Sequence, residues 1–135
     1  MLRIFAPILI SLGTLFYTVT ANRTSRKIAR RNWRKEKIHA LADEICEIAA
    51  DYWLTEEDDV ENKKRALGLK YRLTDIELHG TALGINVSGI IEKMSDHATG
   101  GLFETPGRKA LATDNEKFLQ LRLQSQLLKE KIGDH

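Results

Sequence analysis

The chain has 135 residues, of which 42% are hydrophobic, 30% charged and 7% aromatic, an amount of protein suited to one small domain. Because aromatic side chains are so few, a large sandwich or barrel core is not expected. Cys46 is the only cysteine, so an internal disulfide and a thiolate metal cluster are both excluded. We interpret Cys46 as a small buried apolar side chain, with a reactive or lipidated thiol as the alternative.

Charge is strongly segregated along the chain, although the formal net charge is only +2. Residues 1–37 hold nine basic side chains and one acid, Glu36, whereas residues 38–62 hold nine acids and no Lys or Arg. Charges of both signs are interspersed in the remainder. The distribution of charge along the chain therefore says more about possible binding partners than the overall pI does.

The first segment, residues 4–21, contains no charged residue. As a helix it would extend about 27 Å, close to the roughly 30 Å thickness of a bilayer's hydrocarbon core. We predict that it is a transmembrane anchor. A cleavable signal peptide is one alternative, since Val19 and Ala21 satisfy the small-residue rule for cleavage after Ala21. A buried helix of a soluble protein is the other.

The second segment, residues 22–37, is predicted to be a basic juxtamembrane helix, because its Arg and Lys residues recur at helical spacing. Such a block resists translocation and predicts an N-terminus outside and a C-terminal domain in the cytoplasm. Near an anionic inner leaflet, each of these charges would contribute about 1 kcal/mol of attraction. The predicted membrane-surface residues are Arg23, Arg26, Lys27, Arg30, Arg31, Trp33 and Arg34. A nucleic-acid-binding arm is a less favoured use of the same charges, because no recognised nucleic-acid motif accompanies them.

A helical hairpin is predicted over residues 38–95. Between residues 25 and 54 no Pro or Gly interrupts a helix, and apolar residues there repeat every three or four positions, as in a heptad seam. The seam consists of Ile38, Leu41, Ile45, Ile48 and Tyr52, with Ala42 and Ala49 beside it. A second helix is predicted from 56 to 79, with Thr55 as its N-cap and Asp58 at the capping-box position.

This second helix carries two apolar stripes on roughly opposite sides. One consists of Val60, Leu67, Tyr71, Thr74 and Leu78, and the other of Ala66, Leu69, Leu73 and Ile76. One stripe can pack on the first helix, so the other requires the C-terminal helix or a neighbouring protomer. Residues 80–94 stay undecided, because three glycines weaken a helix whose apolar spacing nevertheless continues.

Residues 96–112 are predicted to be a loop, and residues 113–132 a C-terminal helix with a capping box formed by Thr113 and Glu116. Its apolar stripe is Phe118, Leu121, Leu128 and Ile132, with Ser125 in the middle position. Leu119, Leu123 and Leu127 are expected to support this stripe from the sides. The predicted fold class is therefore all-α, a transmembrane helix followed by a small cytoplasmic helical bundle.

No catalytic, cofactor or metal site is predicted. The four histidines lack ligand-like spacing, no serine lies in a nucleophile-elbow context, and Cys46 is too far from His39 for a hydrogen-bonded pair. Two places could dock a protein partner. They are Tyr52-Trp53-Leu54 and the loop of Gly100, Gly101 and Phe103. The alternative interpretations are closure of the hairpin core and ordinary turn chemistry, respectively.

These features together resemble a group of small uncharacterised bacterial single-pass inner-membrane proteins. The resemblance rests on the apolar N-terminus, the basic segment, Tyr52-Trp53-Leu54 before an acidic turn, and Thr99-Gly100-Gly101 followed by Phe103-Glu104. It implies a location in the bacterial inner membrane and carries no activity or catalytic residue.

The sequence thus favours a membrane-anchored, non-enzymatic scaffold that contacts an anionic inner leaflet and forms a homo-oligomer; its protein partner is unknown. A membrane-perturbing effector, such as a toxin or phage-defence component, is the first alternative. A nucleic-acid tether acting through the basic segment is the second, and nucleic acid is an unlikely partner.

Overall fold

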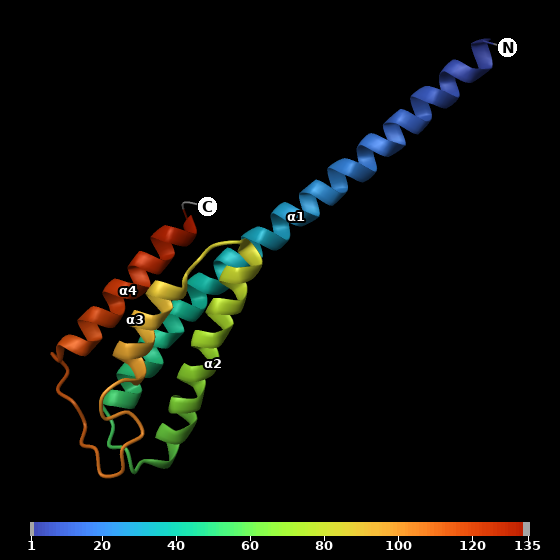
Figure 1. Ribbon diagram of the computed structural model, residues 1–135. Coiled ribbons are helices and arrows are strands. Elements are labelled where there is room, and N and C mark those ends of the chain that lie inside the picture. The colour runs from blue at the N-terminus through green and yellow to red at the C-terminus, as the bar shows by residue number, and fades with distance from the viewer. Residues whose placement is uncertain (1, 134–135) are drawn as a thin grey trace. The chain divides into compact units, whose positions relative to one another are not determined.

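A computed structural model describes the backbone of residues 2–133 and the side chains of residues 10–133. Within this range there are four helices and no strand: α1 (Leu2–Trp53), α2 (Val60–Leu83), α3 (Ser88–Thr99) and α4 (Glu116–Gly133). The all-helical class is therefore confirmed (Figure 1). The chain divides into two units, residues 1–33 and residues 34–135.

The first unit is the N-terminal part of α1. Every described side chain from residue 10 to residue 30 is exposed, including those of the apolar run. Threonine hydroxyls at 14, 18, 20 and 24 donate to carbonyls one turn earlier, which satisfies them without a tertiary partner. In the predicted anchor, residues 4–21, the side chains of residues 4–9 lie outside the described part of the structure. Among those described, no helix combines the length and the apolarity needed to cross a membrane.

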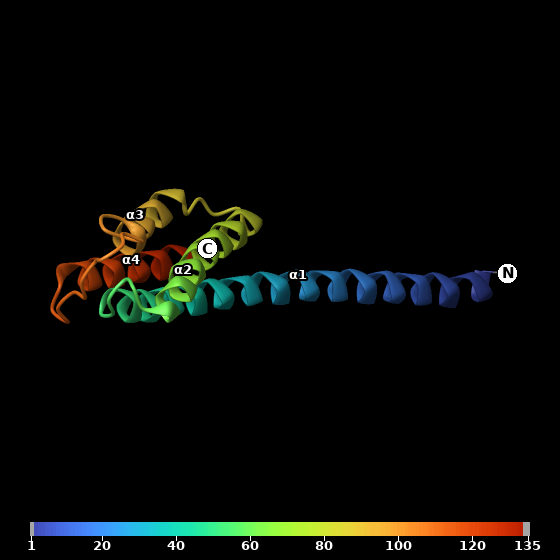
Figure 2. The same ribbon diagram turned by 90° about the horizontal axis from the view of Figure 1, so that it is seen from below.

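The second unit is a helical bundle formed by the C-terminal part of α1 with α2, α3 and α4 (Figures 1 and 2). Arg34 contacts His79 and Glu44 contacts Arg72, so α2 runs antiparallel to α1. Lys117 lies over the Trp53 ring and Lys129 pairs with Asp43, so α4 is antiparallel to α1 as well. The helix α3 packs on both α2 and α4. Consecutive helices therefore alternate in direction, as short connections favour.

The predicted heptad seam of the first helix forms the centre of the core. Its members are buried except Ile48, which is partly buried. The predicted stripe of α4 is likewise buried at Leu121, Ser125, Leu128 and Ile132. The stripe of α2 that faces the core begins one turn earlier than expected. It consists of Asn62, Ala66, Leu69, Leu73, Ile76, Gly80 and Leu83.

Two predicted apolar faces are not covered within the chain. Val60, Leu67, Tyr71 and Leu78 of α2 are exposed, so the expectation of the C-terminal helix as the partner of this stripe is wrong, and the alternative, a neighbouring protomer, stays a prediction. Leu119, Leu123 and Leu127 of α4 are also exposed, and the prediction that they support the core from the sides is wrong. Both errors arise because one face of each helix already fills the small core.

Several predicted helix ends are also wrong. Asp59, not Thr55, caps α2, its carboxylate accepting from the amide of Glu61. Asn115, not Thr113, accepts from the amide of Lys117 at the start of α4. The undecided residues 80–94 complete α2 and begin α3, so the predicted hairpin contains a third helix. Because α3 continues to Thr99, the connection to α4 comprises residues 100–115 rather than 96–112.

Candidate functional site

The most elaborate cluster in the bundle lies at the C-terminal end of α1. Tyr52 and Trp53 are fully buried there, with ring centroids 5.2 Å apart in an edge-to-face arrangement. Phe103 from the α3–α4 connection packs on both rings, 4.9 Å from Tyr52 and 6.2 Å from Trp53. The indole Nε1 donates to the carbonyl of Ala98 at 2.8 Å. The cluster thus joins the ends of α1 and α3.

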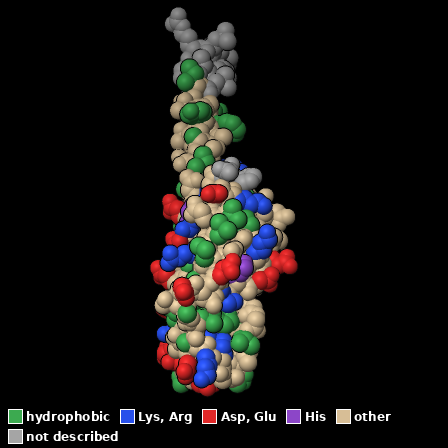
Figure 3. All heavy atoms as spheres, turned by 90° about the vertical axis from the view of Figure 1, so that its left-hand side faces the viewer, with side chains coloured by type: hydrophobic (Ala, Val, Ile, Leu, Met, Phe, Trp, Pro, Cys, Tyr) green, Lys and Arg blue, Asp and Glu red, His purple; other side chains and the backbone are tan. Residues whose placement is uncertain are grey.

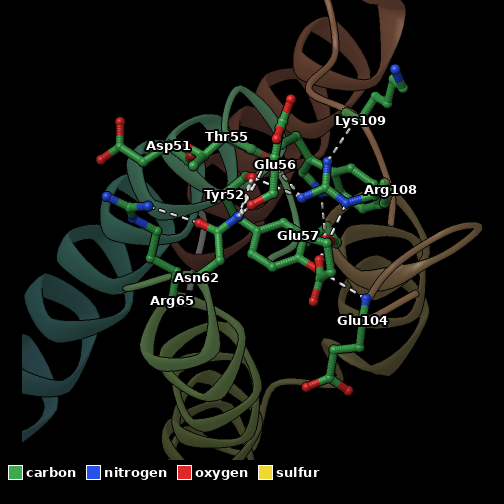
Figure 4. A network of polar contacts seen from close by, with 12 residues as sticks. Asp51, Tyr52, Thr55, Glu56, Glu57, Asn62, Arg65, Glu104, Arg108 and Lys109 are labelled. Atoms are coloured by element: carbon green, nitrogen blue, oxygen red, sulfur yellow. Dashed lines mark hydrogen bonds and ion pairs between the residues drawn. The ribbon is translucent and has the colours of Figure 1, made fainter. Parts of the chain in front are cut away.

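Arg108 supplies a buried charge to this cluster, and only 1% of its side chain is exposed. Its guanidinium donates to the carbonyls of Tyr52 (3.1 Å), Thr55 (2.9 Å) and Lys109 (3.1 Å) and pairs with Glu57 at 3.3 Å (Figure 4). The same group lies 4.7 Å from the Tyr52 ring centroid and 4.6 Å from that of Trp53. Arg108 therefore supplies donors to carbonyls at and just beyond the C-terminal end of α1, where the helix has no further amides to offer.

Asn62 satisfies the neighbouring carbonyls from the start of α2. Its amide nitrogen lies 3.1 Å from the carbonyl of Tyr52, 3.3 Å from that of Thr55 and 3.0 Å from that of Glu56. Its side-chain oxygen accepts from Arg65 at 2.7 Å. Every polar atom of this buried amide is thus used, and the turn between α1 and α2 is held from inside (Figure 4).

Tyr52 links the two networks. Its hydroxyl donates to Glu57 and accepts from the amide of Glu104 at 2.8 Å. Burial and the Glu57 carboxylate raise the pKa of Tyr52 above its ordinary value. The backbone of Glu104 has a positive φ of 58°, a strained conformation that this hydrogen bond helps to hold.

Lys117 reaches the same aromatic cluster from α4. Its ammonium lies 4.3 Å from the Trp53 ring centroid and donates to the carbonyl of His97 at 3.0 Å. Burial and the nearby Arg108 lower the pKa of Lys117 below its ordinary value. Two cations therefore flank one indole, and their main physical effect is to hold α4 and the preceding connection against α1.

The structure brings most of the predicted docking residues together but places them at different depths. Tyr52 and Trp53 are buried, which agrees with the alternative interpretation that they close the hairpin core. Phe103 is partly buried. Leu54 and Gly101 are exposed, so docking at this end stays a prediction for those two positions. Position 100 has no room for a side chain, because a Cβ on Gly100 would lie 2.3 Å from the Asp96 carbonyl oxygen.

Arg108, Asn62 and Lys117 are the members of the cluster that sequence reasoning missed. For Asn62 a signal exists, since the spacing of the buried stripe of α2 extends back through Ala66 to position 62. For Arg108 and Lys117 no local pattern exists, because apart from the neighbouring Lys109 carbonyl their partners come from α1, from the turn after it and from α3, twenty or more positions away.

A groove of about 410 Å³ opens between α1 and α4. It is lined mainly by Cys46, Leu54, Phe118, Leu119 and Arg122. Burial raises the pKa of the Cys46 thiol, although a hydrogen bond from Ser125 opposes this effect. A thiol in this state is a poor nucleophile, which agrees with the interpretation of Cys46 as a small apolar side chain.

The predicted membrane-surface residues lie along α1. The side chains of Arg23, Arg26, Lys27 and Arg30 are exposed, whereas Arg31 and Arg34 are partly covered. Arg34 is within 3.1 Å of His79 on α2 and therefore belongs to the bundle. Trp33, at the end of the first unit, is about half exposed.

Over the described residues, His, Cys, Asp and Glu side chains do not gather in any group of three suited to a metal ion. Comparison with known proteins gives no match to any family, to any curated protein or to any solved structure.

Proposed function

We propose that the chain is a membrane-tethered, non-enzymatic interaction module whose helical domain associates with itself. The observation that supports this proposal is the exposure of large apolar side chains on α1. They are Ile10, Leu12, Leu15, Phe16, Tyr17 and Val19. A single helix that presents this much apolar surface is stabilised when lipid or another chain covers it.

The basic residues that follow favour lipid as the cover. Arg23, Arg26, Lys27 and Arg30 directly succeed the apolar run and are all exposed. Such a sequence of an uncharged helix and then a basic one matches the cytoplasmic flank of an inner-membrane anchor with its N-terminus outside. The acidic residues of the bundle come later in the chain and would be kept from an anionic leaflet.

The interaction role is supported by the exposed apolar faces of α2 and α4. Figure 3 shows apolar side chains at the surface of the bundle among acidic and basic ones. Four large apolar side chains of α2 and three of α4 are exposed, while the core beneath them is closed. Helix faces of this kind bury well against another helix.

Alkaline carbonate extraction of membranes from bacteria that express the full chain tests the tether. We expect the chain to stay with the membrane pellet, and the double variant L12E and F16E to move to the supernatant. The matched control is L119E with L123E, which places the same charges at the same spacing on an exposed face of α4 and stays in the pellet. Extraction of the unmodified chain would contradict the proposal.

A further inference from the structure

The exposed side of α2 forms a second regular seam, opposite the one that packs in the core. We call it the outer face of α2 and define it as Val60, Lys64, Leu67, Tyr71, Thr74 and Leu78. All six side chains are exposed. Their spacings alternate between four and three, the repeat that lets one helix pack along another. On a helical wheel this face lies about 165° from the centre of the buried face.

Charge divides the outer face into two halves. Lys63 and Lys64 lie at its N-terminal end beside Glu61, and Asp75 and Glu77 lie at its C-terminal end, all exposed. A copy of the same helix laid antiparallel places each basic end against an acidic end. The face is therefore complementary to itself in one orientation, which is the requirement for a two-fold symmetric contact.

We propose that the outer face of α2 docks on the same face of a second copy of this chain, with the two helices antiparallel. Val60 then lies opposite Leu78 of the second copy, and Leu67 lies opposite Tyr71 of the second copy. Lys64 lies opposite Thr74 of the second copy, next to its Asp75. This inference rests on the proposed function and identifies the surface through which the domain associates with itself.

A parallel pairing is disfavoured by Lys64. In that orientation the two Lys64 ammonium groups would meet inside the seam, where like charges are costly. The antiparallel pairing places Glu61 near Asp75 of the second copy, an unfavourable contact that the two-fold symmetry repeats. The Glu61 carboxylate is already 3.5 Å from Lys64 of its own chain, so part of its charge is compensated.

Lys70 lies near the two-fold axis, where it would meet its own copy. Its ammonium is 2.8 Å from Glu104 and 5.6 Å from the Phe103 ring centroid of the same chain. That ion pair turns Lys70 toward its own bundle and reduces the repulsion across the axis. The α3–α4 connection, which supplies Glu104, thus borders the proposed contact.

The contact is small, since a helix of 24 residues is about 36 Å long and covers less than a standard protein interface. Two copies in one membrane are related by a two-fold axis along the membrane normal, so the antiparallel contact forms when both α2 helices lie parallel to the membrane plane. In that arrangement the tether raises the effective concentration of the two faces. The pairing is therefore expected in the membrane at chain densities where the same contact in dilute solution would dissociate.

Cysteine crosslinking in membranes tests the pairing and its direction. The full chain with Cys46→Ser is expressed in two tagged forms, one carrying V60C and the other L78C. The antiparallel pairing predicts a disulfide dimer when the two forms are co-expressed and oxidised, and none from either form alone, since like positions are about 27 Å apart along the helix. Self-crosslinking of each form alone would show a parallel pairing and overturn the proposal.

A charged residue introduced into the outer face of α2 provides a second test of the pairing. L67E is expected to reduce the crosslinked product at least tenfold, whereas L123E on α4 is expected to leave it unchanged. These positions are matched controls, because Leu67 is 51% and Leu123 is 50% exposed. Equal loss in both variants, or in neither, would overturn the assignment to α2.

An amine-reactive crosslinker applied to the same membranes separates this inference from the proposed function. A dimer captured through lysines without any 60–78 disulfide overturns the α2 contact and leaves self-association standing. Absence of a dimer with both reagents, in a chain that resists carbonate extraction, overturns self-association as well. Recovery of the 60–78 disulfide supports both.

Discussion

At the scale of single residues, the stability of the bundle depends on buried polar side chains that serve carbonyl groups. Arg108 contributes one set of donors and Asn62 the other, and both serve the carbonyls of Tyr52 and Thr55. None of the buried side-chain nitrogen or oxygen atoms in the described part of the chain lacks a partner. Removing either side chain therefore takes from each of these two carbonyls one of its buried donors.

Replacing Arg108 by Ala is expected to destabilise the bundle by about 3–5 kcal/mol, because Glu57 loses its buried cationic partner and the carbonyls of Tyr52 and Thr55 each lose one of their donors. Urea unfolding followed by circular dichroism measures this change. The control is Lys109→Ala, an exposed neighbour whose contribution to Arg108 is only its backbone carbonyl. Its expected effect is within about 0.5 kcal/mol. A cost for Arg108→Ala as small as that of the control would contradict the role given to Arg108.

His79 is expected to titrate below the ordinary histidine pKa of about 6.5. Burial lowers its pKa first and the charges of Arg34 and Lys37 lower it further, while Asp75 opposes them. NMR titration of the full chain measures the value, and Arg34→Gln is expected to raise it. A pKa that does not change in this variant would show that Arg34 exerts no electrostatic effect on the ring.

The sign of the corresponding effect on stability follows from the lowered pKa. As the pH falls, the unfolded chain binds a proton at this position before the folded chain does. The contribution of His79 is thus complete above the unfolded pKa and is lost as the pH falls toward the folded pKa. Replacing His79 by Gln is expected to remove this part of the acid sensitivity.

At the scale of elements, the sequence predicted the helices better than their ends. The repeats of Ile38, Leu41 and Ile45 and of Leu121, Leu128 and Ile132 identify buried faces, because period and apolarity are local properties. The ends depend on which polar group actually reaches the first amides. Thr55 and Thr113 had suitable side chains and neighbours, yet Asp59 and Asn115 make the contacts.

The cluster around Trp53 could be predicted only in part. Tyr52, Trp53 and Phe103 were recognisable as large apolar residues at a helix end and in a loop. Their burial together with Arg108 depends on the path of the connection between α3 and α4. That path is a tertiary property, since the amide of Leu111 donates to the carbonyl of Trp53, 58 positions earlier.

Two glycines near the link between α2 and α3 are expected to respond in opposite ways to replacement by alanine. Gly84 ends α2 with a φ of 73°, a left-handed conformation in which a side chain is strained. Gly89 lies in α3, and a Cβ there would meet nothing within 4 Å. Gly84→Ala is therefore expected to destabilise the bundle by about 1 kcal/mol, and Gly89→Ala to stabilise it by about 0.5–1 kcal/mol. Thermal unfolding measures both, and changes of the same sign would contradict this account.

At the scale of the whole molecule, the distribution of charge along the chain agrees with the proposal that one unit is a membrane tether and the other an interaction domain. The first unit carries exposed apolar and then basic side chains, and the second carries the closed core and the acidic residues. The proposed scaffold would leave the bilayer intact. Regulated expression is therefore expected to leave the membrane potential unchanged, measured with a potential-sensitive dye. Its collapse would favour the membrane-perturbing effector instead.

The most direct test of the central claim, a tethered chain that pairs in the membrane, is to count subunits in lipid bilayers made from native membranes. The full chain, fused to a fluorescent protein at its C-terminus, is followed by single-molecule photobleaching. The account predicts that the chain is recovered in the bilayer and bleaches mainly in two steps, and that L67E bleaches mainly in one. Single-step bleaching of the unmodified chain, or its absence from the bilayer, would contradict the claim.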